Sequence, residues 1–408
     1  MKLLNINYSD YSGGSAIACS RIHDAFLKCN ADSWLAVCES NNIKKNILTF
    51  SNNFDKIEYL FKKNTCRFLL KFFEKKNNAD LSLSYFNNPL FNTIDINNFD
   101  LVNLHWIGNE TISLNQINKI KKPIIWTLTD MWSFLGLEHI NYFDIEKKYY
   151  WNDESILFKS GININNYVIK KKLRNYNDEI QPVAISQWMA DMASQSIIFK
   201  NKKVDVIPCT IDFDVWKPSS YAKSNDLFEC GNKKIILFSS SAGTDDYKKG
   251  FSYLINALKK IKNLNDYHLV VLGRLNKQIM NDLNISFTEI NRTFFENTTG
   301  LLEIYSSVDL VVMPSLIEAF GQVALEAAAC EIPTIAFNNT GVAEIISHKK
   351  NGYLAEYKNT EDLAFGINWC LEDINLRQLK NNSRTMAMHK FSNKLIINKY
   401  KEVYKKLI

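Results

Sequence analysis

Two glutamates frame a short apolar stretch in the second half of the chain, Glu318 and Glu326 in "EAFGQVALE". If a helix begins near Gly321, the free N–H groups of Gly321, Gln322 and Val323 form a site for an anion such as a diphosphate. Glu318 then precedes the helix and Glu326 lies inside it, so one carboxylate can hold a ribose and the other a sugar. The alternative is that Glu318 only complements the helix dipole and Glu326 is a surface residue.

A pair of lysines supplies cationic groups in the same half of the chain. In "SSSAGTDDYKKGFSYLINAL", Lys248, Lys249 and Gly250 follow an apolar run and precede a helix-like segment. A lysine at such a position can neutralise a diphosphate leaving group. The alternative is an ordinary pair of surface lysines. Taken with the two glutamates, the lysines predict a nucleotide-sugar site.

Strand-like and helix-like segments alternate along the whole chain, which predicts βα units around parallel sheets. In open parallel sheets, ligands bind beyond the carboxyl ends of the strands. The candidate residues in the first half are therefore those that directly follow apolar runs, namely Gly13, Gly14, His105, Asp130 and Ser186.

The alternation breaks in a polar stretch at residues 204–234, which is typical of a linker. We therefore predict an α/β fold of two doubly wound, Rossmann-like domains that face each other across a cleft. The expected N-terminal domain is 1–206, on the acceptor side, and the expected donor domain is 207–390. The amphipathic C-terminal helix, 391–408, is expected to pack back on the N-terminal domain.

Composition excludes several other classes of protein. The net charge of +6, from 49 basic and 43 acidic residues in 408, is too low for a nucleic-acid binder. The eight cysteines include no C-x-x-C pair, which argues against a zinc ribbon or a disulfide scaffold and favours a reducing cytosol. The N-terminal apolar run is too short for a signal peptide, and no membrane span is expected. We expect a cytoplasmic protein.

The spacing of apolar and basic residues predicts a basic amphipathic helix at residues 54–76. Its apolar residues fall largely on one face and lysines line much of the rest; they are Ile57, Leu60, Phe61, Phe68, Leu69, Phe72 and Phe73, and Lys62, Lys63, Arg67, Lys71, Lys75 and Lys76. Such a helix can lie on the inner face of the cell membrane. The alternative is a helix packed on its own domain with a solvated basic face.

The motifs together resemble those of the GT-B-fold, retaining glycosyltransferases of family 4. "YKKGFSYLINAL" and "EAFGQVALE" match that family's K-G and E-x7-E patterns, and "PTIAFNNTGVAEIISHKKNGYL" matches its next conserved run. "YSGGSAIAC", "AISQWMADMA" and "VIPCTIDFDVWKP" resemble its first turn, its S-x-W segment and its linker. "NLHW" and "WTLTDMWSFLG" are similar to a subgroup that builds bacterial surface polysaccharides, including lipopolysaccharide.

The resemblance implies a role for each matching residue. Lys249 would contact the donor diphosphate, Glu318 the hydroxyls of the transferred sugar, and Glu326 the ribose. Gly13 and Gly14 would let the first turn approach the donor phosphate across the cleft. The backbone of four residues would frame the sugar and phosphate, and "RTFFEN" with Phe294 would cradle the base; the four are Phe320, Gly321, Gln322 and Val323.

Two positions depart from the family pattern. Gly243 stands six residues before Lys249, where many members have an arginine, so Lys248 or Arg274 is expected to supply the second charge. Thr129 stands where many members have a histidine. Asp130 is then the best catalytic candidate in the first domain, and His105 and His139 are weaker ones.

No metal or other cofactor is expected. "TDD" at 244–246 lies in a polar loop and "DFD" at 212–214 in the linker, so no D-x-D motif follows a strand. In the family, cationic side chains and helix N-termini hold the diphosphate. The leaving phosphate is thought to take the acceptor's proton, which accounts for the lack of paired catalytic acids.

The resemblance implies a metal-independent, retaining hexosyl- or N-acetylhexosaminyl-transferase. Its donor is expected to be UDP- or GDP-linked and its acceptor a glycan or a lipid-linked glycan at the inner membrane surface. The alternative is a catalytically silent relative that serves as a binding or scaffold partner of other glycosyltransferases.

Overall fold

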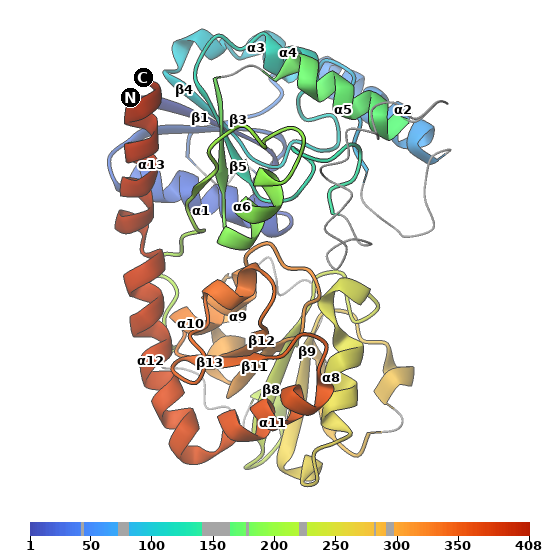
Figure 1. Ribbon diagram of the computed structural model, residues 1–408, viewed down its shortest axis with the longest axis vertical. Coiled ribbons are helices and arrows are strands. Elements are labelled where there is room, and N and C mark those ends of the chain that lie inside the picture. The colour runs from blue at the N-terminus through green and yellow to red at the C-terminus, as the bar shows by residue number, and fades with distance from the viewer. Residues whose placement is uncertain are drawn as a thin grey trace. The chain divides into compact units, whose positions relative to one another are not determined.

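The computed structural model describes residues 1–41, 45–71, 81–140, 164–176, 179–219, 227–280, 283–290 and 298–408. These residues form two compact units, each with its own sheet (Figure 1). The first unit is Met1–Pro208 together with Ile396–Ile408, and the second is Cys209–Leu395. The C-terminal helix α13 (Asn393–Leu407) therefore lies almost wholly in the first unit.

The first unit is built on a parallel sheet of seven strands in the order β3-β2-β1-β4-β5-β6-β7. The order reverses between β1 and β4, because β2 lies on one side of β1 and β5 on the far side of β4. The central strands are buried along their whole length, as the continuous apolar runs predicted. The strands are β1 (Lys2–Ser9), β2 (Asp32–Glu39), β3 (Ile47–Leu48), β4 (Leu101–Leu104), β5 (Ile124–Leu128), β6 (Ile180–Ala184) and β7 (Asp205–Val206).

Helices cover this sheet, and the C-terminal helix shares a core with the first one. Phe26 of α1 stacks on Tyr404 of α13 with the ring centroids 5.7 Å apart, and Ile396 and Ile397 pack in the same cluster. The α13 helix thereby buries its apolar stripe against the first sheet. The helices of the unit are α1 (Gly14–Lys28), α2 (Asn53–Lys71), α3 (Leu90–Thr93), α4 (Leu114–Asn118), α5 (Ile164–Asn175), α6 (Gln187–Ser194) and α13.

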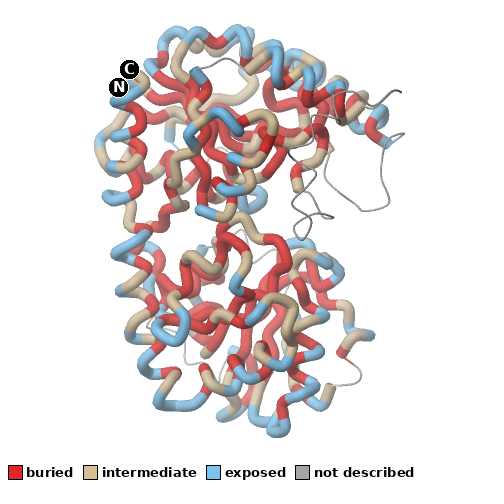
Figure 2. The backbone as a smooth tube through the Cα atoms, in the orientation of Figure 1, coloured by how far each residue is buried: buried red, intermediate tan, exposed pale blue. Residues whose placement is uncertain are grey.

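The second unit repeats the plan with a six-stranded parallel sheet in the order β10-β9-β8-β11-β12-β13. Here the order reverses between β8 and β11. Figure 2 shows most of these strands as buried and the outer sides of the helices as exposed, whereas the residues of the edge strand β10 are intermediate or exposed. The strands are β8 (Lys234–Ser239), β9 (Tyr267–Leu272), β10 (Ser286–Ile290), β11 (Leu310–Met313), β12 (Thr334–Phe337) and β13 (Gly352–Ala355); the helices are α8 (Phe251–Leu258), α9 (Thr298–Ser306), α10 (Gln322–Ala329), α11 (Thr360–Leu371) and α12 (Asp373–Phe391).

Both units are thus doubly wound. In such sheets the carboxyl ends of the two strands at the reversal point diverge into loops, and ligands bind there. The places to look for a site are therefore the loops after β8 and β11 in the second unit and those after β1 and β4 in the first.

Candidate functional site

Lys249 and Glu318 meet at the reversal point of the second sheet. Lys249 follows β8 and Glu318 follows β11, and these two strands are paired neighbours. The Nζ atom of Lys249 lies 2.7 Å from Oε2 of Glu318, and both side chains are partly buried. The structure therefore brings together two of the residues that the sequence motifs singled out.

Backbone contacts hold the two loops against each other. The N–H of Leu316 donates to the carbonyl oxygen of Lys248 at 2.8 Å. Gly250 has a φ of +68°, and a Cβ atom built on it would lie 1.9 Å from the carbonyl oxygen of Pro314. Only glycine tolerates both this backbone conformation and this close approach. Gly250 thus fixes where Lys249 lies relative to the loop after β11.

The α10 helix begins where the sequence predicts, at Gln322, with Gly321 as the residue before it at a φ of 102°. No side chain caps this end. The loop that leads into the helix is tied down because the N–H of Gly341 donates to the carbonyl oxygen of Glu318 at 2.9 Å. Phe320 points its ring into the core, 5.6 Å from the ring of Phe391, so that only its backbone faces the loop region.

Glu326 is buried, with 5% of its surface exposed, so the simple interpretation of this residue as a surface acid is wrong. Its Oε2 atom accepts a hydrogen bond of 2.8 Å from the hydroxyl group of Tyr305 in α9. A buried carboxylate is costly unless it is hydrogen-bonded. The Tyr305 contact was not foreseen from the sequence, because α9 and α10 are separated by β11.

The other two cations of the predicted site lie beside acids of the loop after β8. Lys248 is 3.8 Å from Asp246, and Arg274, which follows β9, is 3.1 Å from Asp245. Gly243 has a φ of +86°, and a Cβ atom there would lie 2.8 Å from the carbonyl oxygen of Arg274. An arginine side chain does not fit at position 243, but the Arg274 backbone lies directly against it. Phe294 lies outside the described residues.

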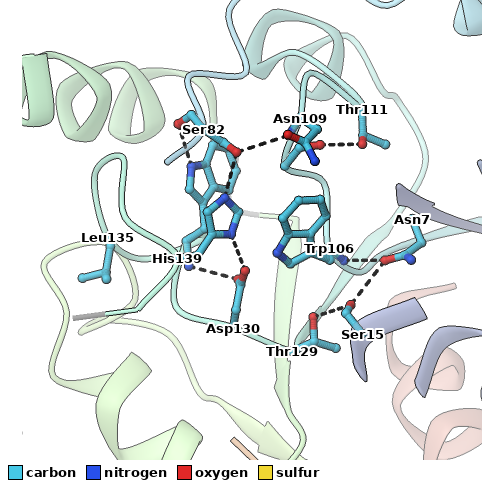
Figure 3. Close-up of polar contacts among 12 residues, drawn as sticks. Asn7, Ser15, Ser82, Trp106, Asn109, Thr111, Thr129, Asp130, Leu135 and His139 are labelled. Carbon is cyan, nitrogen blue, oxygen red and sulfur yellow. Dashed lines mark hydrogen bonds and ion pairs between the residues drawn. The ribbon is translucent and has the colours of Figure 1, made fainter. Parts of the chain in front are cut away.

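The first unit has polar residues at its own reversal point (Figure 3). Gly13 precedes α1 with a φ of 92°, and a Cβ atom built on Gly13 or Gly14 would meet no atom within 4 Å, so the space over this turn is open. Close by, the hydroxyl group of Thr129 lies 2.8 Å from that of Ser15. Thr129, at the place of the family's histidine, is therefore engaged in a contact with α1.

Asp130 forms a chain of contacts with His139 and Ser82 (Figure 3). One oxygen of the Asp130 carboxylate contacts Nδ1 of His139, and the other accepts the N–H of Trp132 at 3.0 Å. The Nε2 atom of His139 lies 2.8 Å from the Ser82 hydroxyl oxygen. Sequence reasoning treated His139 as a separate, weak candidate, and only the fold shows that it positions Asp130.

Aromatic rings and a buried lysine hold this cluster in place. The ring of Trp106 stacks on His139, with centroids 4.8 Å apart. Lys172 of α5 is fully buried and donates hydrogen bonds of 2.9 Å to the carbonyl oxygens of Leu135 and Gly136. Burial lowers the pKa of Lys172, and the nearby Asp130 carboxylate opposes that shift. The lysine thereby anchors the loop that carries Asp130, a function that no sequence motif indicated.

His105 is the third catalytic candidate of this unit, after Asp130 and His139. It is part of the core. It is buried, and its Nε2 atom lies 3.2 Å from the amide oxygen of Asn5. Burial lowers the pKa of His105 to about 3. The ring is neutral near pH 7 and does not exchange protons there, in agreement with a packing residue.

The His105→Gln variant is expected to be less sensitive to acid than the wild type. Below about pH 6.5 the unfolded chain binds a proton at His105 that the folded chain does not, down to about pH 3. This residue therefore removes up to about 1.4 kcal/mol of stability for each pH unit. Urea unfolding at several pH values should show a shallower loss for the variant. An equal slope in both proteins contradicts a neutral, buried His105; the loss due to His268, whose pKa burial also lowers, remains in both.

Among the residues that the structure describes, no group of three or more His, Cys, Asp or Glu side chains is arranged to hold a metal ion. In the same part of the chain, no helix has the length and apolar character needed to cross a membrane. The expectation that no metal is needed stays a prediction.

A comparison with known proteins finds a family match over the segment that carries the lysine–glutamate pair. Residues 222–386 match the family model described as glycosyl transferases group 1. The match contains Lys249, Glu318 and Glu326 and lies within the second unit.

Sequence relatives extend the similarity beyond that segment. An uncharacterised glycosyltransferase of Methanocaldococcus jannaschii is 34% identical over 257 residues, which is 56% of this chain and 65% of that protein, less than two thirds of its length. An uncharacterised 41.2 kDa protein in the cps region of Klebsiella pneumoniae is 25% identical over 330 residues, with 78% of this chain and 81% of that protein covered.

A solved structure shows the same fold along the entire chain. The Anabaena protein HepE, in complex with UDP-glucose, superposes with a TM-score of 0.67 at 16% identity, and all of both chains is covered. The predicted fold class, two doubly wound α/β domains of the GT-B glycosyltransferase type, is confirmed for the two units. The predicted cleft between them stays a prediction.

Proposed function

We propose that this protein is a retaining glycosyltransferase of the family 4 type, which transfers a sugar from a nucleotide-sugar donor to a glycan or lipid-linked acceptor. The observation that carries the proposal is the contact between Lys249 and Glu318 at the reversal point of the second sheet, beside the uncapped start of α10. This arrangement offers a cation and the N-terminal end of a helix to a diphosphate, and a carboxylate to sugar hydroxyls. The group 1 glycosyltransferase match over the same residues supports it.

The ion pair is the resting state of this site. When a donor binds, its diphosphate takes the place of Glu318 as the partner of the Lys249 ammonium group. The Glu318 carboxylate is then available to accept hydrogen bonds from the hydroxyls of the sugar. Glu326 lies inside α10, where the hydroxyl group of Tyr305 from α9 holds its carboxylate. This carboxylate accepts hydrogen bonds from the ribose diol.

The chemistry of transfer needs few protein groups. The bond between C1 of the sugar and the phosphate oxygen breaks, and a bond from C1 to the acceptor oxygen forms on the same face. The acceptor's proton passes to the leaving phosphate oxygen, so that no separate acid–base pair is required. Lys249 and the α10 amides stabilise the charge that develops on the diphosphate, which accounts for a metal-independent reaction.

The sugar is a hexose or an N-acetylhexosamine, the nucleotide is UDP or GDP, and the product belongs to a bacterial surface polysaccharide such as lipopolysaccharide or capsule. Support comes from HepE, whose structure contains UDP-glucose, and from the relative in the Klebsiella cps region. The donor contacts predicted for Gly13 and Gly14 stay predictions, and Lys248 or Arg274 gives the second positive charge.

A second candidate is a catalytically silent relative that binds a nucleotide sugar and acts as a scaffold. The observation that favours it is Thr129, which occupies the expected place of a histidine and is engaged with Ser15. In the transferase proposal, Asp130, which His139 aligns, takes the role of the histidine that Thr129 replaces. In the scaffold proposal, Asp130 has no catalytic role.

Thermal unfolding of the full chain with UDP, GDP and ADP, followed by turnover assays with the corresponding sugars, tests both candidates. A nucleotide at 100 times its Kd adds about 2.7 kcal/mol to the free energy of unfolding. Stabilisation with release of nucleoside diphosphate supports the transferase, and stabilisation without turnover supports the silent relative. If no nucleotide or nucleotide sugar raises the melting temperature, both are wrong.

The Glu326→Gln variant is expected to bind the nucleotide about 10- to 100-fold more weakly, because a charged acceptor for the ribose diol is lost. Tyr305 can still donate to the glutamine, so the fold should be retained. Calorimetric titration with the stabilising nucleotide measures the change. Glu303→Gln, an exposed position on α9, is the matched control, and equal affinities of both variants argue against Glu326 as a ribose ligand.

A further inference from the structure

The α2 helix packs on the first unit with only one face. Tyr59, Lys63, Cys66 and Leu70 are its buried residues. The hydroxyl group of Tyr59 donates to a backbone carbonyl at 2.9 Å, and Cys66 and Leu70 share a cluster with Val168 of α5. The helix thus packs on its own domain through this face.

Large apolar side chains lie on the opposite side of the same helix. Phe54 is 75% exposed, Ile57 65% and Phe61 72%. At 100° per residue, these three positions fall within about 60° of one another and point away from the buried face. Phe68, two turns further on, is on the same line and is 60% exposed.

This arrangement answers the question that the sequence left open about residues 54–76. The helix does pack on its own domain, but its solvent side is apolar and not merely basic. Lys63, which the pattern assigned to the basic face, is buried and lies 3.2 Å from Glu39. Phe72, Phe73, Lys75 and Lys76 lie outside the described residues.

Single exposed apolar residues are ordinary, but Phe54, Ile57 and Phe61 form a continuous exposed apolar line along about 10 Å of helix, which is typical of a binding surface. Basic side chains flank the line. Lys56 and Lys71 lie on one side of it, and the neighbouring α5 exposes Lys170 and Arg174. The two acids of α2 are Asp55 and Glu58, and Glu58 pairs with Lys62.

We propose that α2 docks on an anionic lipid surface, with Phe54, Ile57 and Phe61 inserted between the headgroups and the lysines against their phosphates. The charge decides between the possible occupants. A second copy of this chain would present the same basic face, and like charges oppose such a pairing, whereas an anionic bilayer attracts it. The aromatic and aliphatic side chains contribute by leaving water.

The proposal concerns where the protein works and does not depend on which donor it uses. It also places a lipid-linked acceptor and the first unit at the same surface. Because binding to vesicles needs neither nucleotide nor turnover, it can fail while the glycosyltransferase proposal holds, and the reverse is equally possible.

The test is cosedimentation of the full chain with vesicles of equimolar phosphatidylglycerol and phosphatidylcholine, and with vesicles of phosphatidylcholine alone. We expect binding to the anionic vesicles that weakens as salt is added. Ile57→Ser with Phe61→Ser should reduce the affinity by about 100-fold, and Lys56→Gln with Lys71→Gln by about 10-fold or more.

Ile374→Ser is the matched control, since Ile374 is 83% exposed on α12 in the other unit and should leave binding unchanged. Circular dichroism and melting temperature verify that each variant folds. The proposal is overturned if the wild type binds neither kind of vesicle, or if Ile57→Ser with Phe61→Ser binds as well as the wild type. A wild-type dimer that these two changes convert to a monomer also overturns it, in favour of a second copy as the occupant.

Discussion

The Lys249→Met variant is expected to lose about 10²- to 10³-fold in kcat/KM toward its nucleotide sugar, because it removes the cation that faces the developing charge of the diphosphate. It also leaves the Glu318 carboxylate, now without its partner at 2.7 Å, next to the negatively charged donor. Repulsion from Glu318 adds to the loss, so the effect should exceed that of an ordinary surface lysine.

Stability should hardly change, since a partly exposed ion pair contributes about 0–1 kcal/mol. Lys260→Met is the matched control, because Lys260 lies just after α8, pairs with Glu361 at 2.6 Å and takes no part in the proposed site. Steady-state kinetics and melting temperatures of both variants separate a catalytic loss from a folding defect. Full activity of Lys249→Met would remove the central support for the proposed function.

The Gly250→Ala variant is expected to destabilise the second unit by several kcal/mol. The left-handed backbone costs an L-residue about 1–2 kcal/mol. The new methyl group would meet the carbonyl oxygen of Pro314 at 1.9 Å, and moving the loop away to relieve it costs about 1–3 kcal/mol more. That movement also separates Lys249 from Glu318, so activity should fall together with stability.

A second glycine with a similar positive φ separates the conformational cost from the cost of the close contact with Pro314. Gly231 has a φ of +64°, but a Cβ atom there would meet nothing within 4 Å. Gly231→Ala should therefore show only the conformational cost of about 1–2 kcal/mol and leave kcat/KM unchanged. Urea unfolding measures both variants. If they lose equal stability, the close approach to Pro314 does not matter and another explanation is needed for Gly250.

Local pattern was enough to predict that Lys249 and Glu318 belong to one cluster and that α10 begins beside it. The start of α10 follows from a glycine next to a run of good helix formers, and Lys249 and Glu318 were assigned to one site because each follows a buried strand. Parallel sheets make such inference reliable, since successive strand ends lie at one edge. The sequence also predicted the alternation of strands and helices that gives two doubly wound units.

Other features depended on contacts between segments far apart in the chain. The burial of Glu326 under Tyr305, the alignment of Asp130 by His139 and Ser82, and the anchoring of that loop by Lys172 each join different elements. A short motif cannot specify them, because which side chains meet is decided only when the helices dock on the sheet.

The α2 helix shows the limit of the sequence most clearly. Its amphipathic pattern was readable, and by itself the sequence determined that apolar and basic residues lie on different faces. It did not determine which face the domain covers. The tertiary structure buries the side with Tyr59 and Lys63 and leaves Phe54, Ile57 and Phe61 in water, because Lys63 finds a carboxylate partner in Glu39 and Cys66 and Leu70 find a cluster with α5. Packing partners, which only the folded chain provides, decide which side of such a helix stays available for binding.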